Sequence, residues 1–490
     1  MPLSDLIAIL PELIVIGAAC LVLALDPLTP PSRKDWLAWF SVAALAACAH
    51  LTVSRMGTSV SAFSDLVILD PFSGFWKLLL YGVTGFTILL SLAYLKAERL
   101  NLGEYYGFIL LSLAGMMVMV SAADLLTIYL GMELMSLSLY ILAGFKRFEA
   151  RSLEASAKYF VLGAFSSGML LYGISLLYAA SGSTRLSAIA AAVTARGLAD
   201  PMLALAMTLL AVGFGFKIAA VPFHMWTPDV YEGSPTSVTA FMAVASKAAS
   251  FAAFLRVFIE GLGGLKANWS LLFMLLCFAT LILGNVVAIV QTSIKRMLAY
   301  SSIANAGYAL IGVVVAGHVP ASHEAQAFGL SSVMLYLAIY AFMTLGAFAV
   351  IAMLRKNGVE SDEIEDYAGL AKRQPVAAFL MLAFMASLAG IPPTAGFIGK
   401  FYLFMAAVRA DLTWLAVIGV IFAAISAYYY LRVVMVMYMR EPEASGEQPA
   451  LVTSPVLTVA LACALAGVVI FGLFPNPLVS LATQAVLGMK

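Results

Sequence analysis

Charged residues are scarce in this sequence. Lys, Arg, Asp and Glu make up only 11% of the 490 residues, and 63% are hydrophobic. An ordinary soluble domain carries about 25% charged and about 45–50% apolar residues, so this chain lacks the polar surface that water requires. That excludes a soluble enzyme, a nucleic-acid-binding protein and a disordered protein. The formal net charge of +1 also gives no electrostatic reason to bind polyanions. A polytopic membrane protein remains.

Cysteine and histidine are equally sparse, with four residues of each. The cysteines lie in separate apolar runs: Cys20, Cys48, Cys277 and Cys463. They have neither zinc nor iron–sulfur spacing and are expected to be buried apolar residues. Three histidines, His50, His318 and His323, lie at helix ends or in loops, which disfavours a haem site. With no nucleophile elbow or P-loop either, we expect no metal and no cofactor in this chain.

Long apolar runs dominate the rest of the sequence. A spanning helix takes about 20 apolar residues, and about fourteen runs qualify. They cover approximately residues 4–25, 36–54, 72–95, 105–121, 123–145, 155–179, 202–231, 235–260, 270–292, 297–317, 326–354, 375–409, 412–438 and 453–473. The runs are apolar on all faces rather than alternating, which predicts helices and not a barrel. The predicted fold is an all-α polytopic membrane protein with about 14 transmembrane helices.

The distribution of Lys and Arg among the loops predicts the orientation. Loops after odd-numbered helices hold fourteen of these residues, and loops after even-numbered helices hold five. We therefore expect the first group in the cytoplasm and both termini on the periplasmic side. The first run carries Asp5, Pro11 and Glu12 without a basic n-region, so a retained helix is expected rather than a signal peptide. No transit segment precedes it, which favours the inner membrane of a bacterium.

The seventh and twelfth helices are expected to be broken by proline. Pro222 lacks an N–H, so the carbonyl of Ile218 loses its donor. In the same way, Pro392 and Pro393 free the carbonyls of Leu388 and Ala389. Freed carbonyls inside a bilayer are tolerated only where protein or water satisfies them. The breaks therefore predict that protein groups or water satisfy the freed carbonyls at each position.

The two breaks lie five helices apart, which suggests two copies of a five-helix unit, helices 4–8 and helices 9–13. An odd number of helices gives the copies opposite orientations, as in many transporters. The predicted parts are residues 1–100 with helices 1–3, residues 101–262 and 266–440 with the two repeats, and residues 441–490 with helix 14. The most polar loop, 357–374, is expected to be a solvated cytoplasmic segment, with a docking surface as the alternative.

Ionisable side chains lie deep inside several predicted helices. They are Glu133, Lys158, Lys217, His224, Lys247 and Lys400. A charge at the bilayer centre costs about 2.5–3.5 kcal/mol, so the chain has to use these groups or pair them. Lysine has no lone pair for a metal ion when protonated. Titratable groups separated by gaps that only water can bridge suit proton passage.

Glu133 needs a cation from another helix, and Lys217 and Lys158 are both candidates. Approach and separation of such a pair would shift the pKa of the lysine and release a proton. A static ion pair that fixes helix packing is the alternative. His224 follows Lys217 by seven residues and suits a relay near neutral pH. Lys158 has the further alternative of an interfacial position.

Three stretches resemble the antiporter-like membrane subunits of the proton-pumping NADH–quinone oxidoreductase, respiratory complex I. They are residues 217–247, 295–302 and 390–400. The sequence at 223–233, Phe-His-Met-Trp-Thr-Pro-Asp-Val-Tyr-Glu-Gly, is similar to the N branch of that family rather than to the L or M branch. The resemblance implies a fourteen-helix fold in the proton-pumping arm. It also implies that NADH, FMN, iron–sulfur clusters and quinone belong to partner subunits.

By the same resemblance, Glu133 would pair with Lys217, Lys247 would be the central relay, and Lys400 would connect to the far side. The implied neighbours are subunits K and M, the lateral helix of subunit L, and the lipid bilayer, with no nucleic acid. One position departs from the family, since Asn305 stands where His is frequent and cannot titrate. A cation/proton antiporter and a scaffold with purely structural charges are the alternative functions.

Overall fold

The computed structural model describes residues 3–30, 33–100, 102–197, 200–356, 359–441 and 450–489. Within these ranges, eleven helices are long and apolar enough to cross a membrane. They are α3 (Asp35–Val53), α4 (Pro71–Ala97), α5 (Glu104–Ser121), α6 (Leu125–Ala143), α7 (Ala150–Ser181), the helix Thr236–Gly261, the helix Gly263–Ile289, α14 (Ile294–Gly317), α15 (His323–Met353), α19 (Thr413–Met439) and α20 (Pro455–Leu473). The predicted all-α membrane fold is confirmed, while the count of fourteen and the inverted repeats stay predictions.

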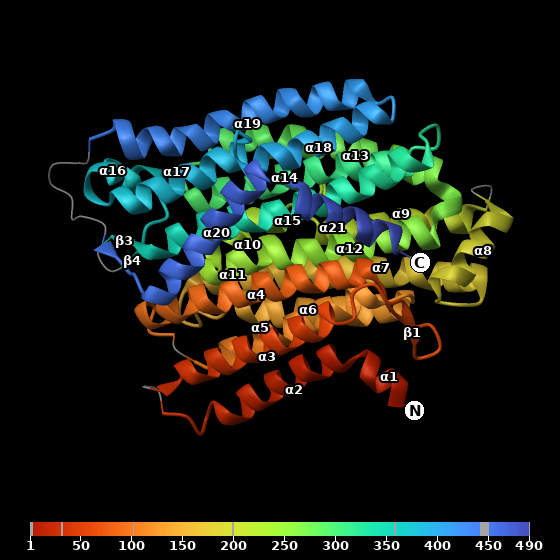
Figure 1. The fold of residues 1–490 in the computed structure, drawn as a ribbon, viewed down its shortest axis with the longest axis horizontal. Helices are drawn as coiled ribbons and strands as arrows, with labels where there is room; N and C mark the ends of the chain where they lie inside the picture. The colour runs from red at the N-terminus through yellow and green to blue at the C-terminus, as the bar shows by residue number, and fades with distance from the viewer. Residues whose placement is uncertain are drawn as a thin grey trace.

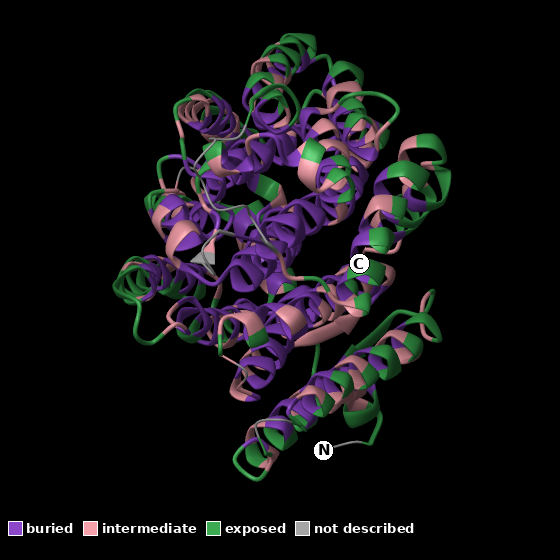
Figure 2. Cartoon of the chain, turned by 90° about the vertical axis from the view of Figure 1, so that its left-hand side faces the viewer, coloured by how far each residue is buried: buried purple, intermediate pink, exposed green. Residues whose placement is uncertain are grey.

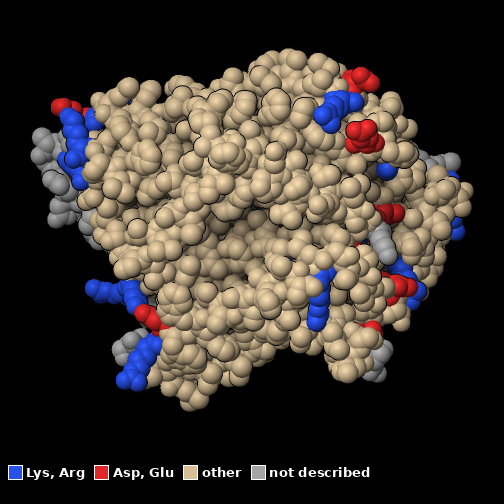
Figure 3. Space-filling model, in the orientation of Figure 1, with Lys and Arg blue, Asp and Glu red and all other residues tan. Residues whose placement is uncertain are grey.

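Shorter helices complete the bundle. They are α1 (Leu3–Ala8), α2 (Leu10–Leu25), α8 (Leu186–Arg196), α9 (Pro201–Lys217), α10 (Trp226–Gly233), α16 (Leu370–Arg373), α17 (Pro375–Ala389), α18 (Ala395–Arg409) and α21 (Asn476–Leu487). Most helices run along one common direction (Figure 1). On the face shown in Figure 3, charged side chains gather toward the two ends of this bundle, with an uncharged band between them. That arrangement suits a bilayer, which excludes charge from its core.

The strands are few and short. β1 (Val60–Ala62) and β2 (Val67–Leu69) form an antiparallel hairpin. β3 (Leu354–Lys356) pairs with both β4 (Val359–Glu360) and β5 (Ala450–Leu451). The second sheet closes one end of the bundle beside α16 and α20 (Figure 1).

The most buried helix lies at the centre of the molecule. It consists of α11 (Thr236–Phe241), the π-turn η2 (Met242–Ser246), α12 (Lys247–Arg256) and a second π-turn, η3 (Val257–Gly261). Its spanning window is entirely buried, and those of α14 and α15 are nearly so, whereas the outer helices expose apolar side chains (Figure 2). π-turns often occur at functional sites, and one ends directly before Lys247.

Both predicted helix breaks are present. α9 ends at Lys217 and α10 begins at Trp226, while α17 ends at Ala389 and α18 begins at Ala395. Gly390 caps α17 with a φ of +87°, a left-handed conformation that glycine adopts without strain. The breaks thus place a helix end, with its unpaired backbone groups, inside each of two membrane-spanning units.

The segment expected to be solvated, 357–374, is only partly exposed in its described part, 359–374; residues 357 and 358 lie outside the described residues. Glu363, Glu365 and Lys372 are exposed. Ile364, Tyr367 and Leu370 are buried. The backbone N–H of Ile364 donates to the carbonyl of Thr292 at 2.9 Å, and Ile294 donates to Asp362 at 2.7 Å. Backbone hydrogen bonds therefore hold this segment against the start of α14, and the short helix Ile364–Tyr367 packs against α19.

Candidate functional site

Three lysines occupy the interior at special points of the fold. Lys217 is the last residue of α9, Lys247 follows the π-turn η2, and Lys400 lies five residues beyond the start of α18. Each is no more than 4% exposed. A helix break or π-turn leaves backbone oxygens without a partner in their own helix, which gives an ammonium group somewhere to bind.

Lys217 hydrogen-bonds to a serine that lies near Glu133 in the chain. Its Nζ donates to Oγ of Ser136 at 2.7 Å, and Ser136 follows Glu133 by three residues on α6. Glu133 is half-buried, and its Oε1 has no hydrogen-bond partner among the described residues. No described cation lies within ion-pair distance of Glu133, although its charge acts on Lys217. In the structure, Glu133 and Lys217 therefore lie near each other but do not form an ion pair.

Lys158 lies elsewhere, in a half-exposed position near the start of α7. Its Nζ is 2.6 Å from Asp229 and 2.7 Å from Glu154, and its side chain is 41% exposed. The structure thus places this residue at the edge of the bundle, in the alternative interfacial position, and not beside Glu133.

His224 lies in the segment between α9 and α10 and is half-buried. Its Nδ1 is buried and has no hydrogen-bond partner within the described chain. Its carbonyl accepts from Thr227 at 2.9 Å and so helps to start α10. An imidazole nitrogen free inside the break can accept or donate a proton through water.

Among the described residues, Lys247 hydrogen-bonds to α14 alone. Its Nζ donates to the carbonyl of Ser302 at 2.6 Å and to Oγ of the same residue at 2.5 Å. The hydroxyl of Tyr340, on α15, donates to that Oγ at 2.8 Å. The sequence analysis did not predict that Ser302 and Tyr340 belong to the site of Lys247. The two adjacent serines, 301 and 302, inside an apolar run were the feature that could have indicated it.

Lys400 hydrogen-bonds to the carbonyls that are freed at the second helix break. Its Nζ donates to the carbonyls of Leu388 at 2.9 Å and Ala389 at 3.1 Å, the two carbonyls that Pro392 and Pro393 are expected to free. Oγ of Ser426 lies 3.5 Å away, and the ring centroid of Tyr308 lies 4.8 Å away. The lysine therefore takes the place of the missing backbone donors.

Hydroxyl and amide groups occupy the space between Lys247 and Lys400. Ser301 and the hydroxyl of Tyr430 are hydrogen-bonded to each other. Nδ2 of Asn305 donates to the carbonyl of Ser301 at 2.8 Å, and the hydroxyl of Tyr336 donates to Oδ1 of Asn305 at 2.5 Å. The gap is thus partly bridged by side chains, whereas the sequence suggested that only water could bridge it.

Other buried cations of the chain behave differently. Lys77 lies 2.5 Å from Glu12, Lys34 lies 2.7 Å from Asp26, and Arg256 lies 2.8 Å from Asp70. Within the described residues, Lys217, Lys247 and Lys400 form no ion pair and contact neutral oxygens. A static structural charge inside a protein is normally paired, so these three lysines form a separate class.

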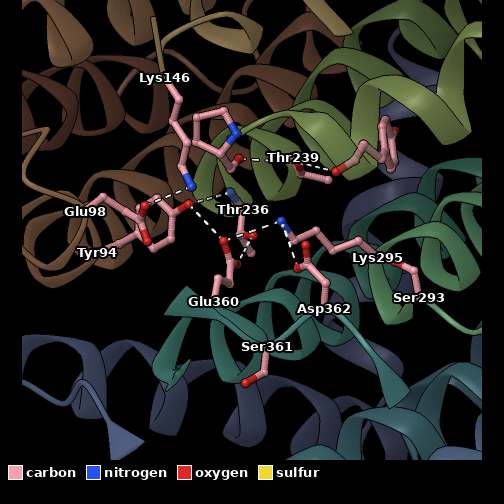
Figure 4. Close-up of polar contacts among 12 residues, drawn as sticks. Tyr94, Glu98, Lys146, Thr236, Thr239, Ser293, Lys295, Glu360, Ser361 and Asp362 are labelled. Atoms are coloured by element: carbon pink, nitrogen blue, oxygen red, sulfur yellow. Dashed lines mark hydrogen bonds and ion pairs between the residues drawn. The ribbon is translucent and has the colours of Figure 1, made fainter. Parts of the chain in front are cut away.

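A charged network closes the end of the bundle near β4. Glu360 accepts hydrogen bonds from Tyr94 at 3.1 Å and from Thr236, and it lies 3.4 Å from Lys295 (Figure 4). Lys295 is also 3.1 Å from Asp362. Burial raises the pKa of the Asp362 carboxyl above its usual 3.8, despite the lowering effect of Lys295. Sequence reasoning missed this network because its members come from segments far apart.

Glu98 joins the same end of the bundle to two basic residues. It lies 2.8 Å from Lys146 and also pairs with Arg355. Burial raises the pKa of Glu98, but the hydrogen bonds and charges of Lys146 and Arg355 outweigh burial and hold that pKa below its usual 4.5. For metals, the described part of the chain contains no group of three or more His, Cys, Asp or Glu residues that would hold an ion.

Comparison with known proteins gives a family match over much of the chain and relatives that match nearly all of it. The family described as NADH:quinone oxidoreductase/Mrp antiporter, TM matches residues 122–426. The chain is 47% identical to NADH-quinone oxidoreductase subunit N of Trichlorobacter lovleyi, over 98% of this chain and 97% of that protein. It is 48% identical to NADH-quinone oxidoreductase subunit N 2 of Rhizobium meliloti, over 98% of each.

Solved structures agree with these matches. A chain in respiratory complex I from Thermus thermophilus with bound aureothin is 33% identical, with a TM-score of 0.79 over 96% of this chain and 99% of that chain. A chain of the Mrp complex from a Dietzia species has a TM-score of 0.82 over 99% of this chain and 97% of that chain. Its 20% identity makes that second likeness one of fold alone.

Proposed function

Because this chain belongs to the family of NADH-quinone oxidoreductase subunit N, and is thus a proton-translocating membrane subunit of that complex, we propose that Lys217, Lys247 and Lys400 carry the protons. The observation that supports this proposal is their set of partners. Each is buried among neutral oxygens, while the other buried cations described above bind carboxylates. Loss of a proton from such a lysine leaves no unpaired acid behind.

The first step takes place between α6 and the break after α9. Lys217 binds Ser136, which lies three residues after Glu133 on α6, so a small movement of either side chain can make or break a direct contact between Glu133 and Lys217. Contact favours the charged lysine, and separation favours release of its proton. His224, in the same break, is the relay between this pair and the surrounding water.

The later steps follow α14 and α18. Lys247 passes its proton by way of Ser302 and the hydroxyl and amide groups around Asn305. Lys400 receives it at the second break and delivers it to the far side. Asn305 contributes a hydrogen bond here and no titrating group, since an amide cannot take up a proton at neutral pH.

The energy comes from outside this chain. Moving one charge against 100 mV costs about 2.3 kcal/mol. We assign NADH, FMN, the iron–sulfur clusters and quinone to partner subunits, and this chain to a non-redox role. Its proposed neighbours are subunits K and M and the lateral helix of subunit L, in a bacterial inner membrane with both termini in the periplasm.

A cation/proton antiporter is the weaker alternative. The matching family description includes the Mrp antiporter, but the likeness to the Mrp complex is one of fold alone. Exchange of sodium for protons in vesicles without NADH would support the antiporter.

The decisive test is Lys247→Ala in the assembled complex. We expect assembly to survive, because Lys247 binds only one serine, and NADH-driven acidification of inverted vesicles to fall to background. Matched vesicles with Lys266→Ala serve as the control, because Lys266 lies at the start of α13 (Lys266–Ile289), where its Nζ donates to Oε1 of Gln326 at 3.1 Å. Normal pumping by assembled Lys247→Ala complexes would contradict the proposal, and a parallel loss of assembly and pumping would favour a scaffold.

A further inference from the structure

One buried carboxylate connects the helix of Lys247 to the helix that binds this lysine. Glu360 lies on β4, and its side chain is only 5% exposed. It accepts hydrogen bonds from Oγ1 of Thr236 and from the hydroxyl of Tyr94, and its Oε2 lies 3.4 Å from Nζ of Lys295 (Figure 4). Thr236 is the first residue of α11, and Lys295 is the second residue of α14. A single side chain thus joins the starts of two helices.

These two helices carry the two sides of the contact at Lys247. Lys247 follows Thr236 by eleven residues along the central helix, and Ser302 follows Lys295 by seven residues along α14. Seven residues are about two turns, so Lys295 and Ser302 lie on the same face of α14. Ser302 supplies both oxygens that Nζ of Lys247 binds, at 2.6 Å and 2.5 Å. The position of one helix start relative to the other therefore decides whether these atoms meet.

Direct packing contributes little to that relation. The segments α11, η2 and α12 pack mainly against α4, α5 and α15, whereas α14 packs mainly against α13 and α15. The π-turn η2 also lies between Thr236 and Lys247, so the interval is not one regular α-helix. The polar bridge through Glu360 is therefore what relates the depth of Lys247 to α14.

The bridge is fastened at both of its ends. On the side of α14, the backbone N–H of Ile294 donates to the carbonyl of Asp362 at 2.7 Å, which holds the strand of Glu360 against the start of that helix. On the side of the central helix, the hydroxyl of Tyr94 accepts from the backbone N–H of Thr236 at 3.1 Å. A shift of either helix start along the bundle would break one of these bonds.

We propose that Glu360 is a positioning residue, which holds the starts of the central helix and α14 in register so that Lys247 meets Ser302. The carboxylate suits this task because one of its oxygens binds Thr236 and the other lies beside Lys295. Glu360 transfers no proton in this role. The inference rests on the proposed function of Lys247 as a proton carrier, and it extends that site to the charged end of the bundle.

Thr236→Val tests the bridge in the assembled complex. The change keeps the size of the side chain and removes the hydroxyl that binds Glu360, which retains Tyr94 and Lys295 as partners, so we expect normal assembly. NADH-driven acidification should fall about tenfold, because a misplacement of about 1 Å can cost about 10²-fold in rate. Thr236→Ser, which restores the hydroxyl, should pump close to the wild type. Wild-type pumping by assembled Thr236→Val, or equally slow pumping by Thr236→Ser, overturns the inference.

A double-variant cycle separates positioning from general support of the fold. Ser302→Ala removes one of the two oxygens that Lys247 binds. If Thr236 acts through that contact, adding Thr236→Val to Ser302→Ala slows pumping by a smaller factor than it slows the wild type, as expected for coupled residues. Two losses that simply multiply would contradict positioning, since distant residues with no shared contact act independently.

Two buried acids beside Lys295 keep the test independent of Thr236. Glu360→Gln weakens the bridge at the carboxylate, whereas Asp362→Asn removes an acid that lies 3.1 Å from Lys295 and, within the described chain, does not bind Thr236. Slow pumping by Glu360→Gln alone supports the bridge even if Thr236→Val fails to assemble. Equal slowing by both acid variants would show that the charge on Lys295 matters and not the bridge, and so would overturn the inference. If Lys247→Ala abolishes pumping while Thr236→Val and Glu360→Gln do not, the bridge fails and the role of Lys247 stands.

Discussion

Lys77 and Lys247 show how two equally buried lysines can have different roles. Both are 2% exposed. Lys77 lies 2.5 Å from Glu12, whereas Lys247 binds the neutral oxygens of Ser302. The first arrangement neutralises a charge and joins α4 to α2. The second holds an ammonium group without a counter-ion, so that the charge can leave with the proton.

Lys77→Met should therefore damage stability and not pumping. Removing one partner of a buried ion pair costs about 3–5 kcal/mol, because Glu12 is left charged and unpaired. We expect heating to release the subunit from the solubilised complex at a lower temperature on native gels, with an unchanged ratio of protons to electrons in the complexes that survive. The double variant Glu12→Gln, Lys77→Met should recover most of the loss. A Lys77→Met complex as heat-stable as the wild type would contradict this assignment.

At the scale of elements, proline chemistry predicts the breaks well. Pro222, Pro392 and Pro393 indicate where α9 and α17 stop, because a missing N–H and a ring clash act locally. The same reasoning predicts that freed carbonyls need partners, and Lys400 supplies them for Leu388 and Ala389. The inverted relation of the two halves stays a prediction.

Contacts between distant elements could not be predicted in this way. Ser302 lies 55 residues from Lys247, and nothing in either segment specifies their hydrogen bond. The π-turn before Lys247 has no sequence signature in its run of small apolar residues. The buried part of the segment 359–374 was not predicted, because Glu360 and Asp362 bind to Lys295 and Tyr94, which belong to other helices.

The end of α4 provides a test that depends on pH. A carboxylate whose pKa is lowered on folding stabilises the fold above its ordinary pKa and loses that effect as the pH falls through the lower, folded-state value. For Glu98 the ordinary value is 4.5. Glu98→Gln should therefore lower the heat stability of the complex at pH 7, by about 1.5–3 kcal/mol for hydrogen bonds to a charged group. The difference from the wild type should shrink below pH 4.5.

Glu365→Gln is the matched control, since Glu365 pairs with Arg440 in an exposed position where ion pairs contribute little. Its heat stability should follow the wild type at each pH. A Glu98→Gln deficit that persists unchanged well below pH 4.5 would show that shape, and not charge, holds the end of α4.

At the scale of the whole molecule, the two charged ends of the bundle have different compositions. One end contains most of the loop Lys and Arg residues, together with Glu98, Lys146, Lys295 and Arg296. The basic side chains there form ion pairs with acidic side chains of other segments. The apolar band between the ends indicates where the bilayer surrounds the bundle. Geometry alone does not decide which end faces the cytoplasm. The excess of basic residues is what favours one orientation.

That orientation is tested by labelling single cysteines in a chain whose four native cysteines are replaced. Phe148, in the basic loop after α6, and Thr58, in the loop after α3, are both exposed. A membrane-impermeant maleimide should label Phe148→Cys only in inverted vesicles, because basic loops stay in the cytoplasm, and Thr58→Cys only in right-side-out vesicles. The reverse pattern would contradict this orientation and place the basic loops in the periplasm.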